Sequence, residues 1–245
     1  MSAGNGRFAA VFFDLDGTLV SERIGVREAR RAVATRMIEL GVWDRPADAF
    51  ADLVEAVIHD ILHDNDWHWP EWLSSEEWLR RTLAAGEVKV YGDELTELSQ
   101  LYREQRVARA AAIAGWQEAL TAARMHGPIG VITNFSDGEM QRDKIASAGL
   151  TGTFDGVFIS GEVGIAKPEP GIFEHACREF GVAMADCVHI GNSVISDVDG
   201  ALAAGMTAVL VEEDDRERPK GLNGDVVWCE DLYAVAQWLK RLRTA

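Results

Sequence analysis

Short, almost uninterrupted apolar runs recur along the second half of this 245-residue chain, and another lies near its beginning. Apolar runs without polar alternation are typical of parallel β-strands, because both faces of a parallel sheet are covered by helices. We therefore predict strands at residues 8–13, 128–133, 157–160, 187–190, 208–211 and 226–228.

Helical periodicity separates these runs. We predict helices at residues 137–148, 168–180, 194–204 and 230–242. Gly149, Gly181 and Gly205 follow the first three, as expected where a helix ends in the left-handed conformation. Helix, glycine and strand in repeated order indicate right-handed βαβ units. The predicted fold class is therefore α/β, with a doubly wound, Rossmann-like parallel sheet.

The stretch between the first two strands has a different pattern. Residues 21–112 show helical periodicity and hardly a strand, with candidate helices at 24–40, 46–62, 74–85 and 93–111. One βαβ crossover needs only about a dozen residues, so we predict that 21–112 form an inserted helical cap domain. The α/β core domain then consists of residues 1–20 and 113–245.

Tryptophan is concentrated in this predicted cap. Five of the eight Trp residues lie there, at Trp43, Trp67, Trp69, Trp72 and Trp78. Large aromatic side chains with an apolar body build the core of a helical module or contact a bound substrate, and we keep both interpretations.

Composition and charge exclude several classes of partner. The net charge of −16 argues against binding to nucleic acid or to an anionic membrane surface. The three Cys residues form neither a zinc pattern nor a disulfide framework, and the apolar stretch 8–13 is too short for a signal peptide. We expect a cytoplasmic protein that is a monomer or a homodimer.

Two carboxylates follow the first predicted strand. Asp14 and Asp16 are separated by one residue, so in an extended chain their side chains point to the same side. Two like charges at a strand tip raise the free energy unless a cation or a chemical role compensates for them. Gly17 and Thr18 come next in the chain. This short segment predicts a functional site.

Other polar residues follow later strands. Thr133 and Asn134 end the second strand, Lys167 follows the third, and Asn192 and Asp197 follow the fourth. Ligands of open α/β sheets bind at the carboxyl ends of the strands, so these side chains are expected to converge. Acids, a cation and fixed hydrogen-bond donors are what nucleophilic phosphoryl transfer requires.

At this point the chain resembles a known family. The segments DLDGTL at 14–19, VITN at 131–134, AKPEPGIF at 166–173 and GNSVISDVDGA at 191–201 resemble the haloacid dehalogenase (HAD) superfamily. The helical insert after the first motif is similar to the phosphoglycolate phosphatase-like subfamily. The resemblance implies a Mg²⁺-dependent phosphatase that hydrolyses a small phosphorylated metabolite through an aspartyl-phosphate.

The resemblance also implies a role for each residue. Asp14 is the expected nucleophile, and Asp16 the general acid and then the base. Thr133 and the backbone N–H of Asn134 are expected to bind the phosphoryl oxygens, and Lys167 to neutralise their charge. The implied metal ligands are Asp14, the backbone carbonyl of Asp16, position 192 and, through water, Asp197.

One position departs from the family pattern, because the fourth motif usually begins Gly-Asp and this chain has Gly191-Asn192. An amide oxygen still binds Mg²⁺, but with one negative charge fewer. Three alternatives therefore stay open. A 2-haloacid dehalogenase uses no metal and typically lacks the second acid, so Asp16 argues against it. A phosphomutase shares all four motifs. A weakly active or non-catalytic binding protein is the alternative that Asn192 suggests.

Overall fold

The computed structural model describes residues 8–21, 23–65, 74–211 and 226–242. The chain divides into two compact units. The α/β unit consists of Met1–Ser21, Ala111–Phe135 and Ala148–Ala245, and the helical unit of Glu22–Ala110 and Ser136–Ser147.

A parallel sheet forms the centre of the α/β unit, and its strands in spatial order are β5-β4-β1-β6-β7-β8. Their bounds are β1 (Ala10–Phe13), β4 (Ile129–Thr133), β5 (Gly156–Ile159), β6 (Cys187–Gly191), β7 (Thr207–Val211) and β8 (Val227–Cys229). Each strand predicted from an apolar run is confirmed, with bounds that differ by one or two residues. The α/β fold class is confirmed as well.

Strand β1 occupies the middle of the sheet, with β4 on one side and β6 on the other. Phe13 at its end pairs with Val131 of β4 and with Ile190 of β6. After β1 the chain builds the sheet outward through β4 and β5, and then outward on the other side through β6, β7 and β8. This reversal of direction is the switch point at which open α/β sheets bind their ligands.

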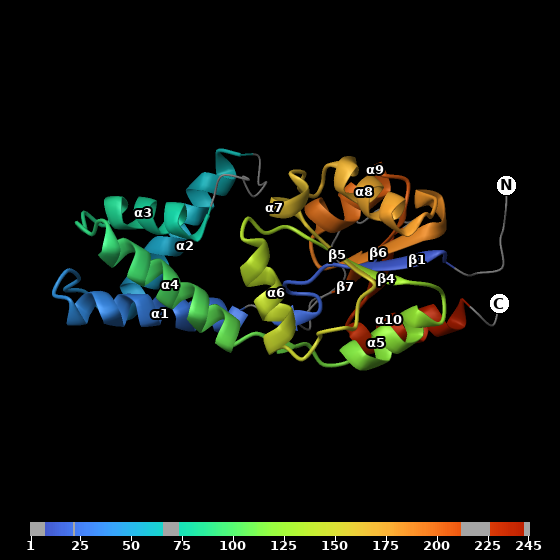
Figure 1. Ribbon diagram of the computed structural model, residues 1–245, viewed down its shortest axis with the longest axis horizontal. Helices are drawn as coiled ribbons and strands as arrows, with labels where there is room; N and C mark the ends of the chain where they lie inside the picture. Colours follow the sequence, from blue (N-terminus) through green and yellow to red (C-terminus); the bar gives the residue numbers. More distant parts are fainter. Residues whose placement is uncertain (1–7, 22, 66–73, 212–225, 243–245) are drawn as a thin grey trace. The chain divides into compact units, whose positions relative to one another are not determined.

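Helices cover both faces of this sheet (Figure 1). Helices α8 (Pro170–Phe180) and α9 (Gly200–Ala203) lie on one face, and α5 (Trp116–Arg124) and α10 (Leu232–Arg241) on the other. Shorter turns are α7 (Ser160–Val163), the 3₁₀-helix η1 (Met184–Asp186) and the π-helix η2 (Val194–Asp199). The helix predicted at 194–204 is thus divided into η2 and α9.

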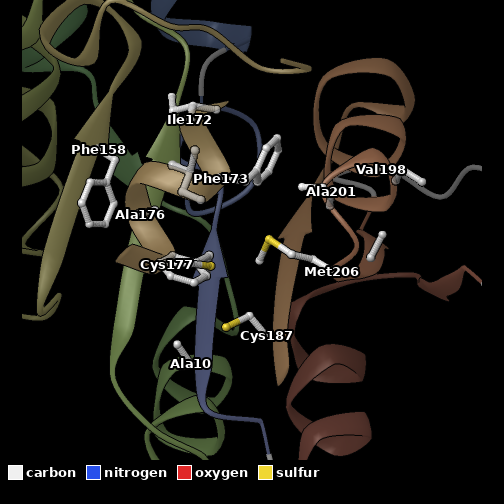
Figure 2. Close-up of a cluster of buried hydrophobic side chains, with 14 of the residues drawn as sticks. Ala10, Phe158, Ile172, Phe173, Ala176, Cys177, Cys187, Val198, Ala201 and Met206 are labelled. Carbon is white, nitrogen blue, oxygen red and sulfur yellow. The ribbon is translucent and has the colours of Figure 1, made fainter. Parts of the chain in front are cut away.

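Apolar side chains fill the space between the sheet and α8 and α9, as Figure 2 shows. Phe12 of β1 stacks on Phe180 with ring centroids 5.2 Å apart. Phe173 of α8 and Cys187 of β6 are fully buried in the same cluster. Burying a large apolar side chain stabilises a fold by about 1.5–3 kcal/mol, so this cluster supplies a large part of the driving force that fixes the strand ends.

Two short strands bracket the helical insert. Strands β2 (Val20–Ser21) and β3 (Ala111–Ala112) pair antiparallel, with Val20 opposite Ala112 and Ser21 opposite Ala111. The chain leaves the α/β unit through β2 and returns through β3. Two residues are too few to show a hydrophobic period, so neither strand is predicted from the sequence.

In the described part of the helical unit, all four helices that periodicity predicts are present. They are α1 (Arg23–Glu39), α2 (Ala47–His63), α3 (Ser75–Ala85) and α4 (Asp93–Ala108). Trp43 and Trp78 are buried in its core, where Trp43 lies edge-on to Phe50 and Trp78 edge-on to Tyr102. These two Trp residues thus belong to the core of the module, whereas Trp67, Trp69 and Trp72 lie outside the described residues.

The helical unit also includes α6 (Gly138–Ser147), which the sequence pattern assigns to the core domain. Ion pairs connect α6 to the helical unit. Arg103 of α4 forms ion pairs with Asp137 at 3.1 Å, Glu139 at 3.4 Å and Asp143 at 2.5 Å. These contacts join α6 to α4, although α6 directly follows β4 in the chain.

The sequence predicts no disulfide framework among the three cysteines. Cys177, Cys187 and Cys229 are free thiols, and all of them are buried. Within the described ranges, every helix is too short or too polar to cross a bilayer.

Candidate active site

Asp14 begins the site, directly after β1. Its backbone N–H donates to the carbonyl of Ile190 at 2.9 Å, which ties the end of β1 to β6. The Asp14 side chain is buried, with 6% of the residue exposed. Beyond it the chain turns sharply, because the N–H groups of Leu19 and Val20 both return to the carbonyl of Leu15. Asp16 lies in this turn and is half-buried.

Lys167 lies beside Asp14 and is itself buried. Its Nζ donates to Asp14 Oδ1 at 2.7 Å, to Asp197 Oδ1 at 2.6 Å and to the carbonyl of Ile132 at 2.8 Å. An ammonium group has three N–H donors, so these three bonds use all of them. The position of the ammonium is therefore fixed by both carboxylates and by β4.

Asn134 fixes the backbone of the same lysine. Its Nδ2 donates to the carbonyl of Lys167 at 2.7 Å, and its Oδ1 accepts the Lys167 N–H at 2.8 Å. A side-chain amide that satisfies both backbone groups of one residue holds that residue as a neighbouring β-strand does. The Asn134 side chain thus contacts Lys167. Thr133, the buried last residue of β4, precedes it.

Asp197 lies in the π-helix η2, a geometry that is frequent at functional sites. Its Oδ1 accepts from Lys167 and from His189 Nε2 at 2.9 Å, and its Oδ2 accepts the Ser193 N–H at 2.9 Å. Gly191 makes this approach possible, since a Cβ there would lie 2.2 Å from the Asp197 carboxyl carbon. Both oxygens of Asp197 therefore have protein donors, and one of these donors is Lys167.

His189 and Ser193 also belong to this network, and neither was predicted from the sequence. Ser193 contributes a backbone N–H, which no residue type signals. His189 does leave a signal, because it is a titratable residue inside the apolar run that predicts a buried strand. A buried polar group needs a partner, so a histidine at that position predicts one nearby.

Burial and charge set the ionisation of the network. Burial, partly opposed by Lys167, raises the pKa of Asp14 to about 7, and the carboxylates of Asp197 and Asp16 contribute to the rise. Burial alone lowers the pKa of Lys167, but Asp14 and Asp197 raise it above its ordinary value. Although burial opposes ionisation, Lys167 and His189 hold the pKa of Asp197 well below its usual range. One cation is thus shared by two acids, and the charge of Asp14 is only partly compensated.

Asn192 follows β6 and contacts the turn after Asp14. Thr18 Oγ1 donates to Asn192 Oδ1 at 3.3 Å. Gly17 has φ +82°, and a Cβ at that position would lie 2.4 Å from the Asn192 amide nitrogen. Glycine is therefore required at position 17 for two reasons, its backbone conformation and the room it leaves for the amide.

Among the described residues, no cluster of three or more His, Cys, Asp or Glu side chains could hold a metal ion. The donors that this end of the sheet offers are of another kind. They are the Asp14 carboxylate, the backbone carbonyl of Asp16 and the Asn192 amide oxygen. All are oxygens, which fits a hard divalent cation, and they include one carboxylate.

The predicted site residues are thus brought together at the carboxyl ends of β1, β4 and β6. Asp14, Lys167 and Asp197 share one hydrogen-bond network, which Asn134 joins through the backbone of Lys167. A second contact joins Asn192 to the Asp16–Thr18 turn.

Comparison with known proteins agrees with this geometry. The family model for haloacid dehalogenase-like hydrolases matches residues 8–205. N-acylneuraminate-9-phosphatase of Mus musculus is 29% identical over 213 residues, which cover 84% of this chain and 83% of the relative. Glyceraldehyde 3-phosphate phosphatase of Methanothermobacter thermautotrophicus is 30% identical over 239 residues, which cover 94% and 99%.

A solved structure is similar along almost the whole chain. The HAD phosphatase of Thermococcus onnurineus has a TM-score of 0.65 and 25% identity, and the alignment covers 94% of this chain and 97% of that chain. The similarity therefore includes the stretch between β2 and β3 as well as the strands that carry the site.

Proposed function

The chain belongs to the haloacid dehalogenase-like hydrolase family, and from this premise we propose that it is a Mg²⁺-dependent phosphatase of small phosphomonoesters. The observation that carries the proposal is the position of Lys167 between Asp14 and Asp197 at the switch point of the sheet. The two relatives named above, which match most of the chain, are phosphatases.

In the first step, a carboxylate oxygen of Asp14 attacks the phosphorus atom. The bond from phosphorus to the leaving oxygen breaks as the bond to Asp14 forms, and Asp16 gives its proton to the departing alkoxide. Lys167 donates to Asp14 Oδ1 and remains beside it, where a fixed cation stabilises the charge that develops on the phosphoryl oxygens. Thr133 and the backbone N–H of Asn134 supply further donors to those oxygens.

In the second step, water hydrolyses the aspartyl-phosphate. Asp16, now a carboxylate, removes a proton from the water as it attacks phosphorus, and the bond to Asp14 breaks. Inorganic phosphate leaves, Asp14 is again a carboxylate and Asp16 again carries a proton. Two acids of different burial suit this division of roles, because Asp14 is buried and Asp16 is half-buried.

Mg²⁺ would be held by the Asp14 carboxylate, the carbonyl of Asp16 and the amide oxygen of Asn192, with Asp197 acting through water. When bound, a divalent cation neutralises phosphoryl charge and orients the phosphate for in-line attack. One carboxylate and two neutral oxygens form a donor set of low charge, so this chain is expected to need a higher Mg²⁺ concentration than one with Asp at position 192.

Hydrolysis of p-nitrophenyl phosphate tests the proposal. We expect turnover that requires Mg²⁺ and stops on chelation, and a loss of at least ~10³-fold in kcat for Asp14→Asn because the nucleophile is removed. Asp199→Asn is the matched control, since Asp199 is an exposed carboxylate of the same fourth motif and should tolerate the change.

Two results would overturn parts of this proposal separately. Turnover that persists in a chelator excludes the metal-dependent mechanism, and full turnover in Asp14→Asn excludes Asp14 as the nucleophile. A panel of phosphorylated metabolites, assayed by release of inorganic phosphate, then identifies the substrate.

A further inference from the structure

We infer that His189 is a positioning residue for the proposed reaction: by donating to Asp197, it keeps Lys167 shared with the nucleophile Asp14. The inference rests on the proposed function, since it concerns the same site. His189 contacts Asp197 and acts on Lys167 through that carboxylate.

His189 is buried, and its side chain has one hydrogen bond to the described residues, the bond to Asp197. It lies on β6 and is 0% exposed. Side chains alternate along a strand, so His189 faces the same side as Cys187, toward α8. There the ring of Phe173 meets the imidazole edge-on, with centroids 5.2 Å apart and planes at 85°. An imidazole in such a place loses its hydration, which costs free energy unless its hydrogen bond compensates.

The direction of the hydrogen bond follows from the partner. Asp197 Oδ1 already accepts from Lys167, and an ionised carboxylate can only accept, so His189 Nε2 must carry the hydrogen. The other ring nitrogen, Nδ1, is buried and has no hydrogen-bond partner in the described part of the chain. A second proton there would place an unsatisfied charge in the core, so the ring is neutral, and burial lowers its pKa accordingly.

The hydrogen bond from His189 affects how strongly Asp197 competes with Asp14 for Lys167. Lys167 Nζ lies 2.7 Å from Asp14 Oδ1 and 2.6 Å from Asp197 Oδ1, so the two carboxylates compete for it almost equally. The bond from His189 ends on the same Oδ1 and offsets part of its charge without adding a second cation. Without it, Lys167 would be the remaining side-chain donor to Asp197, and the buried carboxylate would draw the ammonium away from Asp14.

The consequence is specific to the chemical step. A displaced ammonium stabilises the transition state less, while the groups that bind the phosphoryl oxygens from β4 stay in place. Removing the donor should therefore lower kcat and leave KM nearly unchanged. A histidine that merely filled the core would have no such effect, because an apolar side chain of similar size would replace it.

The test compares two substitutions in the whole 245-residue chain. His189→Met removes the donor and keeps most of the volume, whereas His189→Gln retains an N–H donor near the position of Nε2. With p-nitrophenyl phosphate and Mg²⁺, we expect kcat of His189→Met to fall at least ~10-fold, with KM within about threefold of wild type. His189→Gln should restore kcat to within about threefold of wild type.

Phe173→Leu is the matched control, because it changes the packing against the ring and leaves the hydrogen bond. An unchanged kcat in His189→Met would overturn the inference, as would an equal loss in Phe173→Leu. Inactive wild-type protein would instead refute the proposed function. The inference can still be tested then, and also if His189→Met fails to fold, by ¹⁵N NMR of the histidine rings in the metal-free wild type. The expected spectrum shows a protonated Nε2 and a bare Nδ1 for His189, and a proton on Nδ1 alone would contradict it.

Discussion

Two ion pairs, one from each unit of the molecule, hold their charged side chains in opposite surroundings. In the α/β unit, Lys167 and its partners Asp14 and Asp197 have side chains that are 2%, 9% and 2% exposed. In the helical unit, Arg36 pairs with Glu97 at 2.7 Å, but their side chains are 36% and 50% exposed. The bond lengths are alike, and the surroundings differ.

This difference in burial decides what each pair contributes. An exposed ion pair stabilises a protein by about 0–1 kcal/mol, because water already solvates both partners. A buried pair must overcome several kcal/mol of lost hydration per ion, so it is weak as a source of stability. Stability alone does not explain why one cation is buried with two acids, whereas the proposed phosphoryl transfer does. The contrast therefore separates this buried network from the exposed pair.

Replacing Lys167 is expected to have the largest effect. Lys167→Met leaves two buried carboxylates without their cation, so we expect a loss of about 3–5 kcal/mol in the free energy of unfolding near pH 8, together with loss of turnover. Urea denaturation followed by circular dichroism measures the first effect. A variant as stable as wild type would show that the two buried carboxylates do not need the cation, and that burial does not distinguish this network from the exposed pair.

Asp14→Asn tests the buried network through the pH dependence of its stability. Because the pKa of Asp14 is raised to about 7 in the folded protein, from 3.8, the folded state binds the proton more tightly than the unfolded state. Stability that wild type has at low pH is therefore lost as pH rises through about 7, and the Asn variant lacks this loss. In metal-free protein, the Tm of Asp14→Asn relative to wild type should rise from about pH 5 to about pH 8. A difference that is constant over this range would contradict the assignment.

Asn192→Asp adds a carboxylate at the same end of the sheet. A second acidic oxygen donor should lower the Mg²⁺ concentration for half-maximal activity, by roughly 10-fold. Titration of activity with Mg²⁺ measures it, and Asp199→Asn again serves as the control. An unchanged requirement would show that position 192 is not a metal ligand.

The smallest effect is expected in the helical unit. Arg36→Gln removes the exposed pair with Glu97 and should cost less than about 1 kcal/mol in the free energy of unfolding, with turnover unchanged. Urea denaturation beside Lys167→Met gives the direct contrast. A loss as large as that of the buried lysine would show that exposure does not distinguish the two kinds of pair.

Most of the fold could be predicted because burial leaves a pattern in the sequence. The strands of the central sheet are apolar runs. A run such as 187–190, which lies between two helical segments, is best explained as a buried parallel strand. Helix α5 and strands β2 and β3 were not predicted. The two strands are too short to show a hydrophobic period. Helix α5 follows the insert and has no side-chain N-cap that would mark its start. The grouping of α6 with α4 depends on ion pairs of Arg103 with acids that lie more than 30 residues further along the chain. A local sequence pattern does not show such pairs.

The site, too, contains residues that could be predicted from the sequence and contacts that could not. Asp14, Lys167 and Asn192 could be found because each follows a predicted strand, and carboxyl ends of parallel strands meet. The hydrogen bonds of Asp197 could not be predicted, since they depend on the π-helical turn at 194–199 that directs the carboxylate back toward β6. His189 stands inside an apolar run, where its neighbours suggest core packing, and its partner lies on another element.

The pairing of β2 with β3 has a consequence for how such proteins diversify. Ser21 lies opposite Ala111, so the chain segments on either side of the helical insert pair as the two strands of a hairpin. The helical insert takes the place of the hairpin loop. A tip can lengthen, shorten or be exchanged without moving the strands beneath it, since the cost of closing a loop grows only slowly with its length. The same α/β sheet can in this way carry inserts of different length and structure, and related proteins can differ in the insert while they keep the sheet.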